Sequence, residues 1–176
     1  MHIDVRLMEK GDAGPLSAAF EAVGWHKPVE LFERYLAQQA DGKRTALLAL
    51  ADGEPAGYLT VNWRPRYRPL HAEGYPEIQD FNVLPQYRRR GIGTLLMDIA
   101  EGLAQDRSPV VGIGVGLYAD YGAAQVLYVR RGYVPDGQGV TTCDVPVHPG
   151  HSVCVDDNLV LHFLKELRSP KGGAGA

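Results

Sequence analysis

One stretch of sequence decides how this chain folds: VLPQYRRRGIGT, at residues 83–94. An alternating run at residues 77–84 leads into it, and apolar side chains then recur on one helical face at Leu95, Leu96, Ile99 and Leu103. The pattern predicts a strand, a glycine turn and a helix. Such a turn suits phosphate, because glycines allow close backbone approach and the first N–H groups of a helix have no partner within it.

The rest of the chain alternates between short strands and helices. Runs at 45–51 and 57–63 flank the turn Asp52-Gly53-Glu54-Pro55 and predict an antiparallel hairpin. Residues 64–76 and 135–157 contain proline and glycine and are expected to be long connections. The other expected elements are strands at 2–8, 110–117, 132–134 and 158–167 and helices at 12–23, 31–36 and 121–131. This order indicates a mixed α/β sheet with helices on both faces.

The composition is that of a globular protein. Of 176 residues, 45% are apolar and 22% are charged, which predicts one domain over residues 1–168 and a flexible tail at 169–176. The net charge of −3 gives no general attraction for nucleic acid or an anionic membrane. No apolar run is long enough to span a bilayer and no signal pattern is seen, so a cytoplasmic location is expected.

The two cysteines, Cys143 and Cys154, are too few for a disulfide framework and are expected to be free thiols. With His148 and His151 they form a Cys-x4-His-x2-His-x2-Cys spacing that is compatible with zinc. Prolines within the stretch and the lack of a familiar zinc pattern argue against this, so no metal is predicted. The stretch is instead expected to be a loop that covers a cleft.

Two motifs connect the sequence to a known family. The strand–helix junction matches the pattern Val-x-Pro-x-Tyr-Arg followed by Arg/Gln-x-x-Gly-x-Gly/Ala, at Val83, Pro85, Tyr87, Arg88, Gly91 and Gly93. A second pattern, Ala-x-x-Leu-Tyr-x-x-x-Gly-Phe/Tyr, appears as Ala124, Leu127, Tyr128, Gly132 and Tyr133. In this order, on matching elements, the chain resembles the GNAT superfamily of N-acetyltransferases from its first strand to its last.

The resemblance implies a fold and a cofactor. The fold is a mixed, mostly antiparallel central sheet of about seven strands, splayed in the middle, with helices on both faces. The cofactor is acetyl-CoA, whose pantetheine is expected to bond the backbone of Asn82, Val83 and Leu84. Its phosphates are expected at the turn, on Arg88, Arg89, Arg90, Gly91, Ile92, Gly93 and Thr94.

A glycine pattern on the next strand bears on the same site. Gly112, Gly114 and Gly116 alternate with apolar residues, so one face of that strand has no side chains. Glycines in a strand often mark the close approach of a ligand or another backbone. We expect either the cofactor or tightly packed helix residues on that face.

Acetyl transfer to an amine needs proton removal from the ammonium group, stabilisation of the oxyanion and protonation of the thiolate. By resemblance, Tyr128 is the proton donor and the Val83 amide polarises the thioester carbonyl. Glu77 and Asp80 are alternative bases, which strand alternation places on opposite faces unless a bulge intervenes, and an ordered water relay is a third alternative. Tyr121 stands where many members have Asn and is expected to pack on the pantetheine or face the acceptor.

By family analogy the two long connections wall the acceptor site. They carry aromatic and acidic side chains suited to a hydroxylated, cationic amine: Tyr67, His71, Glu73, Tyr75, Asp144, His148, His151, Asp156 and Asp157. We expect direct attack, in a ternary complex, by the primary amine of a small molecule such as an aminoglycoside-type amino-sugar antibiotic.

The alternatives are a protein or peptide N-acetyltransferase, which would need an open groove, and an acyl-CoA-binding module without catalysis. Neither nucleic acid nor a membrane is expected as a partner, and a homodimer is left open.

Overall fold

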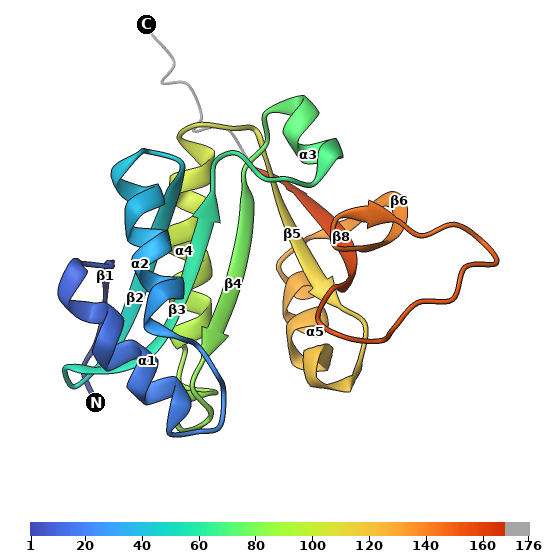
Figure 1. Cartoon of the computed structure of the whole chain (residues 1–176). Coiled ribbons are helices and arrows are strands. Elements are labelled where there is room, and N and C mark those ends of the chain that lie inside the picture. Colours follow the sequence, from blue (N-terminus) through green and yellow to red (C-terminus); the bar gives the residue numbers. More distant parts are fainter. Residues whose placement is uncertain (168–176) are drawn as a thin grey trace, which may run out of the picture. The chain divides into compact units, whose positions relative to one another are not determined.

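A computed structural model describes residues 1–167 of the chain (Figure 1). These residues form eight strands and five α-helices, which confirms the α/β class. Their contacts divide them into two compact units. The first unit is Met1–Trp63 with Ile78–Leu103, and the second is Arg64–Glu77 with the chain from Ala104 on. The predicted tail at 169–176 lies outside the described residues.

The first unit has four strands in the order β1-β2-β3-β4. β1 pairs antiparallel with β2, and β2 pairs antiparallel with β3, which confirms the predicted hairpin. The elements in chain order are β1 (Ile3–Leu7), η1 (Lys10–Asp12), α1 (Ala13–Glu21), α2 (Val29–Ala40), β2 (Arg44–Ala51), β3 (Glu54–Asn62), β4 (Glu77–Val83), η2 (Pro85–Tyr87) and α4 (Ile92–Gln105).

Helices cover both faces of these strands, as predicted, with α1 and α2 on one side and α4 on the other (Figure 1). Phe20 of α1 and Phe32 of α2 pack edge-on against Tyr58 of β3, with ring centroids 5.3 and 5.1 Å apart. All three rings are fully buried. On the other side Gly93 of α4 lies so close to Phe81 of β4 that a Cβ there would be 3.1 Å from the ring. α1 and α2 therefore pack against β3, and α4 packs against β4.

The regular backbone of β4 is interrupted at Asp80. This residue has a φ of 50°, in the left-handed region that non-glycine residues rarely adopt. Its Oδ1 accepts hydrogen bonds from Lys27 Nζ (2.7 Å) and Asn82 Nδ2 (2.9 Å), and its Oδ2 accepts them from the hydroxyls of Tyr58 (2.6 Å) and Tyr35 (2.9 Å). A strained conformation persists where the surroundings fix it in this way.

The second unit has four strands in the order β5-β8-β6-β7. The pairs β5–β8, β6–β8 and β6–β7 are all antiparallel. The elements in chain order are α3 (Arg68–Glu73), β5 (Val110–Gly116), η3 (Ala119–Tyr121), α5 (Gly122–Arg130), β6 (Val134–Thr142), β7 (Val145–Pro146) and β8 (Leu159–Glu166).

Both predicted long connections contain regular structure, which corrects the sequence interpretation. In the first, α3 forms because a proline is tolerated in the first turn of a helix, and Gly74 ends it with a φ of 71°. In the second, β6 extends far beyond the expected strand at 132–134. Gly137 and Gly139 adopt positive φ and interrupt the register with β8 between Pro135 and Val140 without ending the strand. The short β7 makes eight strands in the described residues instead of about seven.

The glycine face of β5 is filled by side chains of the second unit itself. A Cβ at Gly112 would lie 2.4 Å from Leu70 of α3, and one at Gly116 would lie 2.4 Å from the ring of Tyr121. A Cβ at Gly114 would lie 2.7 Å from Val160 of β8. Residues of α3 and η3 thus pack on Gly112 and Gly116, as the second expectation for these glycines had it, whereas a residue of strand β8 packs on Gly114.

The contacts of Asp80 predict a large stability effect for Lys27→Met. Removing the ammonium group leaves a largely buried carboxylate without its cation, which should lower the free energy of unfolding by about 2 to 4 kcal/mol in urea denaturation at neutral pH. The pKa of Asp80 is lowered in the fold, so this contribution is present above the unfolded pKa and is lost as the pH falls through the folded one. The difference in the free energy of unfolding between Lys27→Met and wild type should therefore become smaller at acidic pH.

Lys43→Met is the matched control, because Lys43 pairs with Asp41 on the surface, where the two side chains are 54% and 59% exposed. Its effect should stay within about 0.5 kcal/mol. Equal effects of the two substitutions would contradict the role given to Lys27.

Candidate active site

The first unit carries the predicted phosphate-binding turn between β4 and α4. Arg89 and Gly91 both have positive φ, of 57° and 83°. Glycine relieves the strain at the second of these positions. α4 begins at Ile92, and the first N–H groups of a helix have no intrahelical acceptor. Gly91 and Thr94 are exposed. The turn thus presents backbone donors at the positive end of a helix.

Three exposed arginines lie beside this turn, at 88–90. The Nε of Arg88 donates to the carbonyl oxygen of Val83 at 3.2 Å, and its guanidinium lies over the ring of Trp25, 5.1 Å from the centroid. The loop between α1 and α2, which carries Trp25, therefore fixes one of the three cations next to the end of β4.

Of the three residues expected to bond pantetheine through their backbone, Leu84 already uses its amide and carbonyl groups within the unit. The Leu84 amide donates to the carbonyl of Ala56 at 2.9 Å, and the Leu84 carbonyl accepts from the amide of Tyr87 at 2.9 Å. Its side chain is buried in the core. Both backbone groups of Leu84 are thus used within the unit, so Asn82 and Val83 are the better candidates.

Asp80, one of the two sequence-predicted bases, is poorly suited to accept a proton. Burial acts to raise its pKa, but the Lys27 ammonium and hydrogen bonds from Lys27, Tyr58 and Tyr35 outweigh burial and hold the pKa below its usual value. The carboxylate therefore stays ionised and hydrogen-bonded. Burial and the adjacent carboxylate raise the pKa of both tyrosines, so their hydroxyls stay donors. These contacts favour a positioning role for Asp80.

Tyr128 and Tyr121 belong to the second unit. Tyr128 on α5 is 5% exposed, and burial raises the pKa of its hydroxyl, which stays protonated at neutral pH as a general acid requires. Tyr121 packs on Gly116 and donates to Asp157 Oδ1 at 2.9 Å, and Tyr118 donates to the same oxygen. The structure thus brings together Tyr121 and Asp157, which were predicted for the cofactor and the acceptor respectively.

The second unit gathers three other predicted site residues around a histidine of β8. The imidazole of His162 stacks on the ring of Tyr67, with centroids 3.5 Å apart and planes 3° from parallel. Its Nε2 lies 3.5 Å from Glu77 Oε1 and 4.0 Å from Asp144 Oδ1. The hydroxyl of Tyr67 donates to Asp136 Oδ2 at 2.5 Å. This contact joins the two connections that were expected to wall the acceptor site.

The other acceptor candidates make local contacts. Asp156 accepts from the amide of Asn158 at 2.8 Å, and His71 Nδ1 lies 3.1 Å from the carbonyl oxygen of Pro65. The rings of His148 and His151 have centroids 5.7 Å apart. Glu73 is exposed at the end of α3, and Tyr75 is half-buried shortly after it.

Sequence reasoning missed three residues that hold the predicted ones in place. Lys27 binds Asp80, Asp136 binds Tyr67, and His162 lies between Tyr67 and Glu77. For His162 a signal was available, since a histidine interrupts the otherwise apolar run LVLHFL at 159–164. For Lys27 and Asp136 no local pattern distinguishes the residue from other surface charges.

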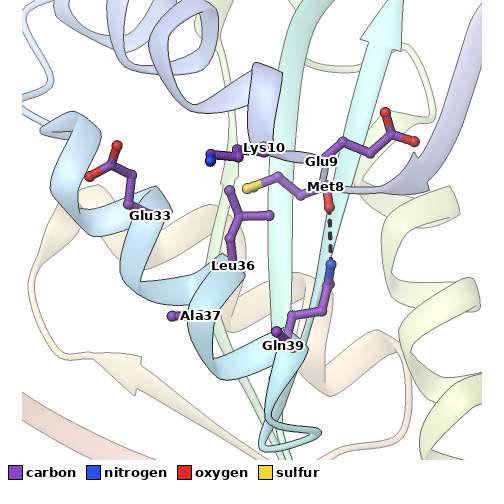
Figure 2. A pocket seen from close by; sticks show the side chains of 8 residues that line it. Met8, Glu9, Lys10, Glu33, Leu36, Ala37 and Gln39 are labelled. Carbon is purple, nitrogen blue, oxygen red and sulfur yellow. Dashed lines mark hydrogen bonds between the residues drawn. The ribbon is translucent and has the colours of Figure 1, made fainter.

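An open pocket on the first unit lies between α2 and the segment that follows β1. Figure 2 shows Leu36 and Ala37 of α2 together with Met8, whose carbonyl accepts a hydrogen bond from Gln39 at 3.0 Å. The full lining is Met8, Glu9, Lys10, Glu33, Leu36, Ala37, Gln39 and Ala40. None of these is a predicted site residue, so we assign the pocket no part in the reaction.

The loop with the two cysteines has no metal-binding geometry. Cys143 and Cys154 are exposed free thiols. Across residues 1–167, no group of three or more His, Cys, Asp or Glu side chains is placed to hold a metal ion. Among the helices of the same residues, none is both long and apolar enough to cross a membrane.

Comparison with known proteins identifies the family. A family model described as the acetyltransferase (GNAT) family matches residues 16–133, and the chain therefore belongs to that family. It is a GNAT-type N-acetyltransferase, an enzyme class that uses acetyl-CoA. No curated protein matches the sequence significantly.

Solved structures have the same fold at low sequence identity. An acetyltransferase of the GNAT family from Streptococcus pneumoniae is 22% identical, with a TM-score of 0.67 over 94% of this chain and 99% of that one. The ribosomal-protein-alanine N-acetyltransferase from Brucella melitensis is 20% identical, with a TM-score of 0.66 over 93% and 99%. The acetyltransferase yncA from Salmonella typhimurium, solved with its cofactor acetyl-CoA, is 17% identical, with a TM-score of 0.64 over 99% of both chains. These likenesses confirm the GNAT fold.

The residues of the turn fit this cofactor. A pyrophosphate needs backbone donors, positive charge and a backbone that it can approach, and residues 88–94 provide all three. Gly91 keeps a left-handed φ without a Cβ, and Arg88, Arg89 and Arg90 are exposed beside it. The turn would hold the phosphates, and the bound cofactor would supply an acetyl thioester for transfer.

A charge introduced at Gly93 should block phosphate binding. Gly93→Glu places a carboxylate in the first turn of α4 and presses its Cβ against Phe81. Affinity for acetyl-CoA, measured by calorimetry, should fall by more than about tenfold through repulsion and loss of space.

Gly102→Glu is the matched control on the same helix, because a Cβ at Gly102 meets nothing within 4 Å. It should leave the affinity within about twofold. If a folded Gly93→Glu variant binds acetyl-CoA as wild type does, the assignment of this turn is wrong.

Proposed function

We propose that the enzyme transfers the acetyl group to the primary amine of a small cationic molecule, with an aminoglycoside-type amino sugar as the first acceptor to test. One observation carries the acceptor class: Glu77, Asp136 and Asp144 all lie around the stacked pair Tyr67–His162 in the second unit. Carboxylates beside aromatic faces suit an ammonium group and a sugar ring. We place the reaction in the cytoplasm, as the sequence suggests.

The chemistry is divided among a few groups. Tyr128 gives its proton to the leaving sulfur, because its raised pKa keeps the hydroxyl protonated until a thiolate forms nearby. The amide of Val83 stabilises the negative charge that develops on the carbonyl oxygen. Of the two predicted bases, Glu77 is the better candidate to help remove the amine proton, because Asp80 is held ionised by its four donors. The amine attacks directly, with both substrates bound.

A panel of amines tests the acceptor class. Release of free thiol from acetyl-CoA should rise with an aminoglycoside or a related amino sugar, and mass spectrometry should show one added acetyl group on the amine. A peptide with a free N-terminal alanine tests the protein acetyltransferase alternative. Activity with the peptide alone would contradict the small-molecule proposal, and slow thiol release that no amine stimulates would contradict amine transfer altogether.

Tyr128→Phe should lower kcat about 10- to 1,000-fold while changing KM for acetyl-CoA much less, because a proton donor acts mainly in the transition state. Tyr133→Phe is the matched control, since that ring is also buried in the second unit, 5.9 Å from the ring of Tyr128. Its kcat should remain within about twofold of wild type. A Tyr128→Phe kcat as high as that of the control would remove Tyr128 from the mechanism.

A further inference from the structure

His162 is held in a fixed orientation inside the second unit. It is 2% exposed, and its position on β8 pairs with Gly114 of β5, where a Cβ would lie 3.4 Å from Nε2 of the imidazole. Stacking on Tyr67 fixes the plane of the ring, and the hydrogen bond from Tyr67 to Asp136 fixes Tyr67 in turn. Stacking on one face and burial therefore hold the imidazole in one orientation.

The surroundings of Nε2 decide where the neutral ring carries its proton. Nε2 faces two carboxylates, Glu77 at 3.5 Å and Asp144 at 4.0 Å. A bare Nε2 would set its lone pair against negatively charged oxygens, whereas an N–H there is attracted by both. The neutral imidazole should thus carry its proton on Nε2 and leave the lone pair on Nδ1.

Nδ1 has the opposite surroundings. It is buried and has no hydrogen-bond partner within residues 1–167. A buried polar atom without a partner is destabilising, and such atoms are rare in proteins unless they have a function. A basic nitrogen with a free lone pair, on a ring oriented by a carboxylate through its other nitrogen, is the arrangement of a catalytic base.

We propose that His162 is the general base of the acetyl transfer, with Nδ1 as the accepting atom and Glu77 and Asp144 as the positioning residues that set its tautomer. This inference rests on the proposed function and adds a catalytic residue to it. Glu77 then acts through His162 instead of touching the amine.

The proton transfers balance. An N–H bond of the substrate ammonium breaks and an N–H bond forms at Nδ1. The freed lone pair forms the C–N bond, and the C–S bond breaks with its electron pair on sulfur, which takes the proton of Tyr128. The second amine proton returns to the Tyr128 oxygen, and the imidazolium releases its proton to water. The sum is amide, free thiol and one proton.

The charged and titratable groups that face the imidazole come from different segments. They include Glu77 from the start of β4, Asp144 from the turn between β6 and β7, and Tyr67 from the segment before α3, whose hydroxyl bonds Asp136 of β6. The carboxylates stabilise a positive charge on the ring once the proton has moved.

The first test needs no substrate. Nitrogen NMR of histidine-labelled wild-type enzyme, assigned with His162→Gln, reports the tautomer of His162 directly. The proposal predicts the neutral form with the proton on Nε2 and an unprotonated Nδ1. A neutral form with its proton on Nδ1 overturns the proposal, whatever the activity of the enzyme.

The second test compares two amide substitutions with the acceptor identified in the panel. His162→Gln should lower kcat about 100-fold or more, as loss of a general base does, with KM for acetyl-CoA nearly unchanged. Glu77→Gln keeps an acceptor for the Nε2 proton and should lower kcat much less, by about tenfold. The double variant should be no worse than His162→Gln, because the two residues act as a unit. A Glu77→Gln loss larger than that of His162→Gln would make Glu77 the direct base and overturn the proposal.

Rescue separates a chemical role of His162 from a structural one. Added imidazole should restore a measurable part of kcat to His162→Ala and none to Tyr128→Phe, whose defect lies elsewhere. His2→Gln, on the surface, controls for the loss of a histidine and should match wild type. Wild-type thiol release that no amine stimulates would defeat the proposed function itself. An active wild type with an equally active His162→Gln defeats the further inference alone.

Discussion

Four hydrogen-bond donors from four segments converge on the carboxylate of Asp80, and the arrangement of the first unit depends on this convergence. Lys27 comes from the loop between α1 and α2, Tyr35 from α2, Tyr58 from β3 and Asn82 from β4 itself. A carboxylate that is removed from water must be paired and hydrogen-bonded, or it is strongly destabilising. The segments are therefore fixed relative to β4, and the same loop places Trp25 under Arg88, next to the glycine turn.

Buried polar groups of the second unit also need partners, but at His162 only one of the two ring nitrogens has them. At His162 the Nε2 atom has two carboxylates within 4.0 Å, whereas Nδ1 has no partner in the described chain. A fully satisfied polar group holds a structure together, as Asp80 does. A rigidly held group with one unsatisfied atom is instead prepared for a ligand. By this contrast we distinguish the positioning role of Asp80 from the catalytic role proposed for His162.

Sequence patterns were sufficient where the physical cause is local. The strand–turn–helix around residues 83–94 follows from periodicity and two glycines, and the helix that carries Tyr128, expected at 121–131, is observed as α5. Sequence patterns failed where local signals disagree with the fold, and where the contacts join residues far apart in the chain. The glycines at 137 and 139 suggest a loop, yet β6 continues through them with an interrupted register. The roles of Asp80 and His162 depend on partners far away in the chain, which no spacing rule relates to them.

We propose that the glycine turn receives the phosphates of the cofactor. Residues of the second unit provide the acid and the base. Backbone amide NMR during a titration with coenzyme A tests the first half most directly. We expect large, saturating shifts at Gly91, Gly93 and Thr94 that are much smaller with pantetheine, which lacks the nucleotide and its phosphates. Saturable binding of coenzyme A that leaves these three amides unshifted would contradict it.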